Sequence, residues 1–242
     1  AADSSYQSAT SGDVAVSFAK ADQTITASAN PTSTSWANTS TVSSSGTSGT
    51  GAITYTLDEG ENCATSSAVC QLSGTTVSAT GPGVCDVYAS IATDTNYETA
   101  TSSDVAVTFT KATQSITASA NPTSTSSANT SSVSSSGSSG TGTITFALDE
   151  GANGHTSDPV CQLAGTTVSA TAAGSCFVYA FIPGDSNYDA ATSADVAITF
   201  AELAQSITAS ASPTSTIWTN TSTLSSSGFA GTGVVTYSID HG

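Results

Sequence analysis

The stretch that decides the fold is residues 69–109, which read VCQLSGTTVSATGPGVCDVYASIATDTNYETATSSDVAVTF. Near its end, Val105, Val107 and Phe109 alternate with small or polar residues, so their side chains fall on one face of an extended strand. Turn-forming residues at Ser73-Gly74 and Gly81-Pro82-Gly83 separate the apolar runs. The stretch therefore predicts strands at Val69–Leu72, Thr76–Ala79, Val84–Ala92 and Val105–Phe109.

The same pattern returns at a fixed interval of 91 residues, and this offset aligns the whole chain without a gap. The segment Asp94-Thr-Asn-Tyr97, for example, recurs as Asp185-Ser-Asn-Tyr188 and as Asp3-Ser-Ser-Tyr6. We therefore predict two whole repeats and two partial ones. Residues 1–20 match the C-terminal part of a repeat, 21–111 and 112–202 are whole repeats, and 203–242 match the N-terminal part.

Three further strands are predicted earlier in the first whole repeat, at Gln23–Ser28, Thr39–Ser44 and Ala52–Leu57. Seven short strands in about 90 residues are typical of a sandwich of two sheets, and a closed barrel is the alternative. Between the whole repeats, residues 107–116 run from one strand almost directly into the next, without a Gly/Ser linker. We expect tandem all-β sandwich domains that form a semi-rigid rod.

The composition favours a folded β-protein over a disordered stalk. The chain holds 46 Ser and 43 Thr, yet 37% of it is apolar and these residues alternate regularly. The net charge is −16, and Lys20 and Lys111 are the only Lys or Arg residues. Because nucleic acids and anionic membranes require clusters of cations, neither is an expected partner. No apolar run approaches the roughly 20 residues of a membrane span.

Four of the five cysteines belong to the repeat, since Cys70 and Cys85 recur as Cys161 and Cys176. We expect each pair to form a disulfide around a three-strand meander, although two buried thiols are an alternative and zinc would need more ligands. Disulfides indicate an extracellular location. Cys63 has Gly154 as its counterpart, which leaves a free thiol or a cross-link between chains.

The chain begins and ends inside a repeat, which suggests a segment of a longer array. The alternative is that the tail of one chain completes the head of the next. This alternative has a difficulty, because residues 1–20 and 203–242 together lack 31 positions of a repeat, including the cysteine pair.

Three strings carry a family resemblance: GTGAITYTLDEG at 49–60, the stretch at 69–109 quoted above, and KATQSITASANP at 111–122. They resemble bacterial immunoglobulin-like repeat domains, which occur in tandem in large secreted or surface-anchored proteins, often adhesins. The resemblance covers essentially the whole chain. It implies a β-sandwich with a mechanical or adhesive role and no catalytic residue.

A binding surface has few candidates in the sequence. Trp36 and Trp218 share a repeat position with Ser127 between them, so we interpret them as exposed contacts rather than core. The tyrosines of the Asp-x-Asn-Tyr segments are interpreted as packed rings whose hydroxyl caps a loop, as in a tyrosine corner. Glycosylation sequons begin at one repeated position, at Asn38, Asn129 and Asn220. A chance triplet that was copied by duplication explains them equally well.

Catalytic chemistry finds little support. His155 and His241 occupy positions that are not histidine in the other repeats, so we expect both to lie in solvent-exposed loops. The sequence holds no nucleophile elbow and no phosphate-binding loop. Asp58, Glu59 and Glu61 form an acidic loop that could bind calcium, but the spacing differs from known calcium loops and a solvated loop is the alternative.

The sequence therefore predicts a non-enzymatic structural spacer, a stalk or filament segment of a large extracellular surface protein. Neighbouring repeats or identical chains are the expected partners. The alternative is an adhesive module that binds glycan, a host or cell surface, or a partner protein through its loops or the Trp36 and Trp218 surfaces. A third reading is an accessory region of an enzyme whose catalytic part lies elsewhere. No cofactor is predicted.

Overall fold

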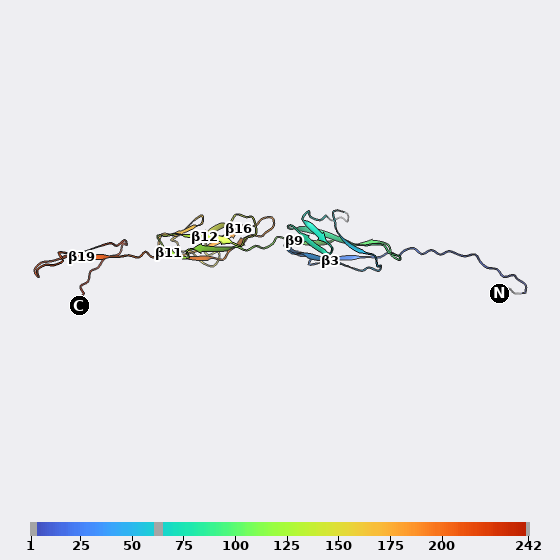
Figure 1. Cartoon of the computed structure of the whole chain (residues 1–242), viewed down its shortest axis with the longest axis horizontal. Coiled ribbons are helices and arrows are strands. Elements are labelled where there is room, and N and C mark those ends of the chain that lie inside the picture. Colours follow the sequence, from blue (N-terminus) through green and yellow to red (C-terminus); the bar gives the residue numbers. More distant parts are fainter. Residues whose placement is uncertain (1–3, 61–64, 241–242) are drawn as a thin grey trace. The chain divides into compact units, whose positions relative to one another are not determined.

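A computed structural model describes residues 4–60 and 65–240 (Figure 1). All regular elements in these ranges are β-strands. Among the described residues there is no helix of the length and apolar character that crossing a membrane requires. The chain divides into two compact units. Unit 1 comprises Ala1–Gln114 with Gly184–Asp189, and unit 2 comprises Ser115–Pro183 with Ala190–Gly242.

Unit 1 is a sandwich of a four-stranded and a five-stranded sheet. The first has the order β1-β3-β6-β5, and the second has the order β2-β9-β7-β4 with β8 paired to β7. All pairings are antiparallel except β2 with β9, which is parallel. The strands are β1 Thr26–Asn30, β2 Ser33–Ser35, β3 Ser40–Ser45, β4 Ile53–Leu57, β5 Cys70–Ser73, β6 Thr76–Ala79, β7 Gly83–Ile91, β8 Ala100–Thr101 and β9 Val105–Thr110.

Unit 2 repeats this arrangement with the sheets β10-β12-β15-β14 and β11-β18-β16-β13, where β17 pairs with β16. Its registers match those of unit 1: Thr26 faces Ser45 between β1 and β3, and Thr117 faces Ser136 between β10 and β12. The strands are β10 Thr117–Asn121, β11 Ser124–Ser126, β12 Ser131–Ser136, β13 Thr145–Leu148, β14 Cys161–Ala164, β15 Thr167–Ala170, β16 Gly174–Ile182, β17 Ala191–Thr192 and β18 Val196–Ala201.

The core of each unit lies between its two sheets and is made of alternating strand residues. In β9, Val107 and Phe109 are buried while the residues between and after them face solvent. Across the sandwich they meet Val42 of β3 and Val77 of β6. Unit 2 places Ile198 and Phe200 of β18 in the equivalent core. The predicted two-sheet sandwich is therefore confirmed, and the closed barrel is wrong because two separate sheets face each other.

The seven predicted strands of the first repeat are present, with ends shifted by up to three residues. Two short strands were missed. Strand β2 reads Ser-Thr-Ser and β8 reads Ala-Thr, so neither carries an apolar alternation. Both exist because a neighbouring strand offers unpaired backbone groups, which sequence periodicity does not report.

Residues outside the two sandwiches show that alternation alone does not make a strand. Val14, Val16 and Phe18 repeat the pattern of β9, yet they form no strand and are 70–92% exposed. Near the other end, β19 Thr208–Ser212 and β20 Thr223–Ser227 form a two-stranded sheet of their own. Alternation yields a strand only where a neighbouring strand supplies backbone hydrogen bonds, and a second sheet that covers the apolar face adds stability.

Both expected disulfides are present, Cys70–Cys85 and Cys161–Cys176, with Cα atoms 5.7 Å apart in each pair. The expectation that they bracket a meander is wrong. Strands β5 and β6 form a hairpin in one sheet while β7 belongs to the other, so Cys70–Cys85 ties the two sheets together. Cys63 lies outside the described residues.

Candidate functional site

The loop between β7 and β8 is organised by one carboxylate. Oδ1 of Asp94 accepts hydrogen bonds from the backbone N–H groups of Asn96 and Tyr97 at 2.8 Å, and Oδ2 accepts one from Thr50 N–H at 2.7 Å. These backbone donors, with Thr50 the strongest, lower the pKa of Asp94 to about 2. Because this loop follows β7, Tyr97 does not occupy the position of a tyrosine corner, which lies just before that strand.

The equivalent loop after β16, at Gly184–Asp189, belongs to unit 1 and has the same geometry. Oδ1 of Asp185 accepts hydrogen bonds from Asn187 and Tyr188 N–H at 2.8 Å. The carbonyl oxygen of Asn187 accepts a hydrogen bond from Ala112 N–H at 2.9 Å, just as that of Asn96 accepts one from Ala21 N–H at 2.8 Å. The sequence motif therefore encodes one loop shape twice.

Trp36 contacts this second loop within unit 1. Its indole Nε1–H donates a hydrogen bond to Asn187 O at 2.8 Å, and its ring meets Tyr188 edge-on with centroids 5.7 Å apart. The backbone N–H of Trp36 also donates to Thr110 O at the end of β9. The side chain is half-buried and packs beside the core, so the expectation of an exposed Trp36 is wrong. Trp218, at the equivalent position, is 95% exposed.

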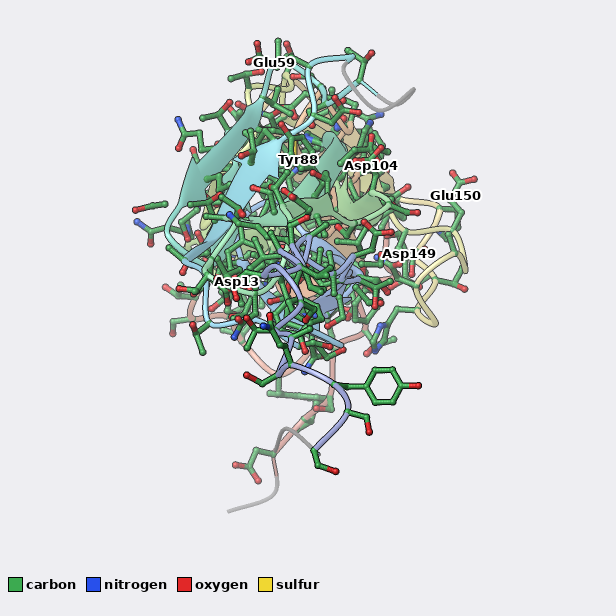
Figure 2. All side chains as sticks on the ribbon, turned by 90° about the vertical axis from the view of Figure 1, so that its right-hand side faces the viewer. Asp13, Glu59, Tyr88, Asp104, Asp149 and Glu150 are labelled. Carbon is green, nitrogen blue, oxygen red and sulfur yellow. A yellow bond between two sulfur atoms is a disulfide. The ribbon has the colours of Figure 1, made fainter. Side chains whose placement is uncertain are left out.

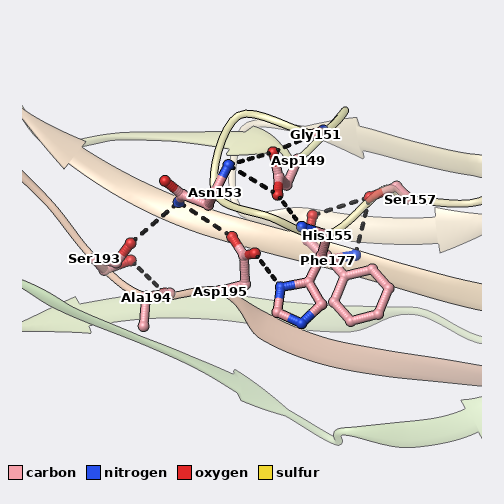
Figure 3. Close-up of polar contacts among 9 residues, drawn as sticks. All are labelled: Asp149, Gly151, Asn153, His155, Ser157, Phe177, Ser193, Ala194 and Asp195. Atoms are coloured by element: carbon pink, nitrogen blue, oxygen red, sulfur yellow. Dashed lines mark hydrogen bonds and ion pairs between the residues drawn. The ribbon is translucent and has the colours of Figure 1, made fainter.

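A second polar network lies in unit 2, in the loop that follows β13 (Figure 3). Asp149 is fully buried, and its carboxylate accepts hydrogen bonds from the backbone N–H groups of Gly151, Asn153 and His155. Burial by itself would raise the pKa of Asp149, but the loop N–H donors together outweigh it and lower that pKa. Asp149 is therefore a buried carboxylate whose partners are the backbone N–H groups of its own loop.

His155 closes the same network. Its Nδ1 lies 2.8 Å from Oδ2 of Asp195, a carboxylate whose side chain is only 3% exposed. Its ring stacks on Phe177 with centroids 4.6 Å apart, and Asn153 Nδ2 donates a hydrogen bond to Oδ1 of Asp195 (Figure 3). The side chain of His155 is 55% exposed, as expected for a loop, but it is anchored on both sides. Nothing local in the sequence indicates this pairing, because Asp195 is 40 residues away.

The ligand atoms of Asp149, His155 and Asp195 lie within 4.8 Å of one another, which is a spacing that a metal ion could bridge. Both oxygens of Asp149 already accept two N–H groups each, and both oxygens of Asp195 have protein partners. Because a carboxylate oxygen has two lone pairs, a metal would have to displace N–H donors from Asp149, whereas each oxygen of Asp195 accepts a single hydrogen bond. The hydrogen-bonding capacity of the Asp149 carboxylate is met by its own loop.

The calcium prediction concerns the equivalent loop of unit 1. Asp58 is fully buried and accepts a hydrogen bond from Gly60 N–H at 2.9 Å, whereas Glu59 is exposed and points outward (Figure 2). Glu61 lies outside the described residues, as does His241. Asp58 and Glu59 thus face different surroundings, and calcium at this loop stays a prediction.

In each of the three sequons, the serine stabilises the turn on which the sequon lies. Ser40, the third residue of the first sequon, is buried, and its hydroxyl donates a hydrogen bond to Pro31 O at 2.7 Å. Ser131 and Ser222 make the same bond to Pro122 and Pro213. Asn38 is exposed beside Ser35, with which it shares the turn. The fold therefore explains the repeated serine without a glycan.

Both units also carry a shallow groove beside the β4 and β13 edges. In unit 1 it is lined by Ile53, Tyr55 and Leu72, and in unit 2 by Ile144, Phe146 and Leu163. The groove contains no ionisable side chain other than the Tyr55 phenol, whose oxygen lies 3.0 Å from the Ser44 hydroxyl. The groove therefore combines apolar side chains with threonine and glycine residues.

The strand order defines the class of fold. Labelled in chain order, one sheet of unit 1 is A-B-E-D and the other is A′-G-F-C, which is the arrangement of an immunoglobulin domain. The disulfide differs from the B–F bridge of antibody domains, because Cys70 lies in the D strand and Cys85 in F. The units are therefore immunoglobulin-type sandwiches in which the disulfide joins strands D and F.

No family model and no curated protein matches the chain. Among solved structures, the crystal structure of murine CEACAM1b is similar over 74% of this chain and 100% of that chain, with 13% sequence identity and a TM-score of 0.25. A likeness this low carries no argument about fold or function. The assignment of the fold class rests on the strand order above.

Proposed function

We propose that this chain is a structural spacer, an extracellular stalk or filament segment of a large repetitive surface protein. The main support is that units 1 and 2 build the same sandwich with the same strand registers, and that each fastens its two sheets with one disulfide. Stability repeated from unit to unit is what an array of copies requires. The 91-residue repeats at 21–111 and 112–202 would be its building blocks, and the two sandwiches would form a semi-rigid rod.

Three further observations support a structural role. The disulfides suit an oxidising, extracellular location. The carboxylates of Asp149 and Asp195 are engaged in hydrogen bonds within unit 2. His155 replaces the Ala64 of the first repeat, so the fold itself does not require a histidine there. We therefore propose that this chain does not catalyse a reaction. Tandem copies of this kind fit the bacterial immunoglobulin-like repeats that the sequence resembles.

Electron microscopy of the native material, paired with its mass before and after reduction, tests the proposal. We expect uniform filaments or rods. A mass far above 23.6 kDa after reduction would make this chain one stretch of a giant polypeptide. Short rods that carry a globular head would identify a stalk. Isolated globular particles of 23.6 kDa with no extended assembly would contradict the structural role.

An adhesive module is the second candidate, and one observation favours it. Trp218 is 95% exposed, and an exposed tryptophan suits stacking on a sugar ring or a partner. Trp36 is engaged inside unit 1, so the candidate surface narrows to Trp218. Glycan-array binding that is lost in Trp218→Ser and kept in Trp36→Ser would support adhesion. Negligible binding that neither substitution changes would remove it.

A further inference from the structure

Each sandwich leaves the β4 or β13 edge of its five-stranded sheet open. In the described part of the chain, both strands stand last in their sheets, and each pairs with a single neighbour, β7 or β16. Natural proteins often protect such edges with proline or with charged side chains. Strand β4 reads Ile-Thr-Tyr-Thr-Leu and β13 reads Thr-Phe-Ala-Leu, so neither carries this protection.

The hydrogen bonds between β4 and β7 show which backbone groups of β4 face outward. Asp58 N–H donates to Asp86 O at 2.8 Å, just beyond one end of β4. Ala92 N–H donates to Ala52 O at 3.0 Å, just beyond the other end. Because pairing alternates along an antiparallel strand, the even-numbered residues 52–58 direct their backbone groups toward β7. The N–H and C=O groups on the open side therefore belong to Ile53, Tyr55 and Leu57.

Unit 2 presents the same row of backbone groups. Asp149 N–H donates to Phe177 O at 2.8 Å, which is the counterpart of the Asp58 hydrogen bond. The same alternation turns the backbone groups of Phe146 and Leu148 away from β16. Two rows of outward-facing donors and acceptors thus recur 91 residues apart. An extended chain that added to either row would make main-chain hydrogen bonds with it.

The groove beside each row would receive side chains of an added strand. In unit 1 it lies between β4 and the β5–β6 hairpin, lined by Ile53, Tyr55, Leu72, Gly74 and Thr75. The unit 2 groove uses the same repeat positions: Ile144, Thr145, Phe146, Leu163, Gly165 and Thr166. Ile53 is 42% exposed, so apolar surface is open there. Because strand side chains alternate between faces, apolar residues at every second position of an added strand would cover Leu72 or Leu163.

Electrostatics select the kind of strand that suits these edges. The chain carries a charge of −16. Glu59 lines the continuation of the unit 1 groove, beside Tyr55, Leu57 and Leu72. Glu150 occupies the same repeat position in unit 2, and both glutamates are exposed. Self-pairing of two such edges would bring like charges together, whereas a basic segment would be attracted.

We propose that β4 and β13 each bind an extended basic segment of another protein as an additional strand. Apolar residues of this segment alternate with Lys or Arg. The apolar side chains lie over Leu72 or Leu163, and the basic side chains face solvent, with Glu59 or Glu150 near the end of the strand. A partner with several such segments gains from multivalency along the repeats. This binding activity goes beyond the proposed spacer role and does not depend on it.

Binding at one edge is expected to be weak. A single short strand buries less than the roughly 1,000 Å² of a stable interface, so we expect a dissociation constant of about 0.1–1 mM. Added salt should weaken the binding further, because it screens the attraction between the basic segment and the acidic chain.

Nuclear magnetic resonance of the full ¹⁵N-labelled chain tests the proposal, with Cys63→Gly as background to prevent cross-linking. The probe is an acetylated and amidated peptide of alternating lysine and valine, added up to about 1 mM. A peptide of the same composition with its valines consecutive is the control and should cause much smaller shifts. We expect the alternating peptide to shift the amide signals of the outward-facing residues progressively, and less at higher salt: Ile53, Tyr55, Leu57, Phe146 and Leu148.

A substitution in unit 1 locates the site, with unit 2 as the internal reference. Ile53→Lys places a cation in the unit 1 groove, so it should abolish the shifts in β4 and retain those in β13. Thr41→Lys adds the same charge at an exposed position of β3 and should retain both sets. If Ile53→Lys unfolds unit 1, the comparison of the two peptides on the unsubstituted chain decides.

Three results would overturn the inference. The first is the absence of shifts at both edges, and the second is equal shifts with the two peptides. The third is a shift of the same amide signals when the chain alone is concentrated, which would identify a second copy as the occupant. Filaments or rods in the native material bear only on the spacer role, so the failures of the two proposals are distinguishable.

Discussion

Among single residues, Asp94 holds a loop that has no regular secondary structure of its own. Its pKa is lowered to about 2, below the value of about 3.8 to 3.9 expected for an unfolded chain. A lowered folded-state pKa contributes stability that is present above the unfolded pKa and is lost as the pH falls through the folded one. The carboxylate should therefore stabilise unit 1 at neutral pH and cease to do so between about pH 4 and pH 2.

Replacing Asp94 by Asn should lower the melting temperature of unit 1 at pH 7, and the difference from the unsubstituted chain should shrink progressively below about pH 4 and be small by about pH 2. Thermal unfolding followed by near-ultraviolet circular dichroism across this range measures the effect. Asp13→Asn, at an exposed position, is the matched control and should show no such pH dependence. A difference that stays constant down to pH 2 would argue against ionisation as the cause.

A substitution at Ser40 tests whether the third residue of the sequon stabilises the fold independently of glycosylation. Removing its buried hydroxyl in Ser40→Ala leaves Pro31 O without that donor and should cost about 1–3 kcal/mol in the free energy of unfolding. Asn38→Gln destroys the same sequon but keeps the hydroxyl, so unglycosylated protein should lose much less. Urea unfolding of both variants compares them. Equal losses would mean that the Ser40 bond is not what stabilises the turn.

At the scale of strands, the Cys70–Cys85 bridge ties β5 to β7 across the sandwich. The double variant Cys70→Ala/Cys85→Ala should lose about 3 kcal/mol of unit 1 stability, as the chain-entropy model gives for a loop of this length. Amide hydrogen exchange under native conditions measures the stability of each unit separately. Unit 2, with Cys161–Cys176 intact, serves as the internal reference, and equal loss of protection in both units would be inconsistent with a local effect.

Strand β9 and residues 13–18 make a matched pair, because both carry Val-x-Val-x-Phe. Phe109 is 2% exposed, so Phe109→Ala should cost about 3–5 kcal/mol. Phe18 is 92% exposed, and Phe18→Ala should change the free energy of unfolding by less than about 0.5 kcal/mol. Urea unfolding measures both. A large effect of Phe18→Ala would mean that residues 4–20 pack against a sheet in solution.

The same comparison shows how far the sequence could predict this protein. Alternation and turn residues located the strands that form the core, because burial on one face leaves a period of two. The pairing of Asp195 with His155 and of Trp36 with the Asp185–Tyr188 loop could not be read in this way. Such contacts join residues 40 and 151 positions apart, and nothing local in the sequence marks them.

For the whole molecule, the parallel pairing of β2 with β9 has a mechanical consequence. These strands lie near the beginning and the end of the first whole repeat and run in the same direction, as do β11 and β18. A pull on the two ends of a repeat would load their hydrogen bonds along the strands, so that the bonds resist together instead of opening one by one. Once these hydrogen bonds broke, the residues enclosed by the Cys70–Cys85 disulfide could not extend. The unfolded repeat would therefore be about 50 Å shorter than a chain without the disulfide.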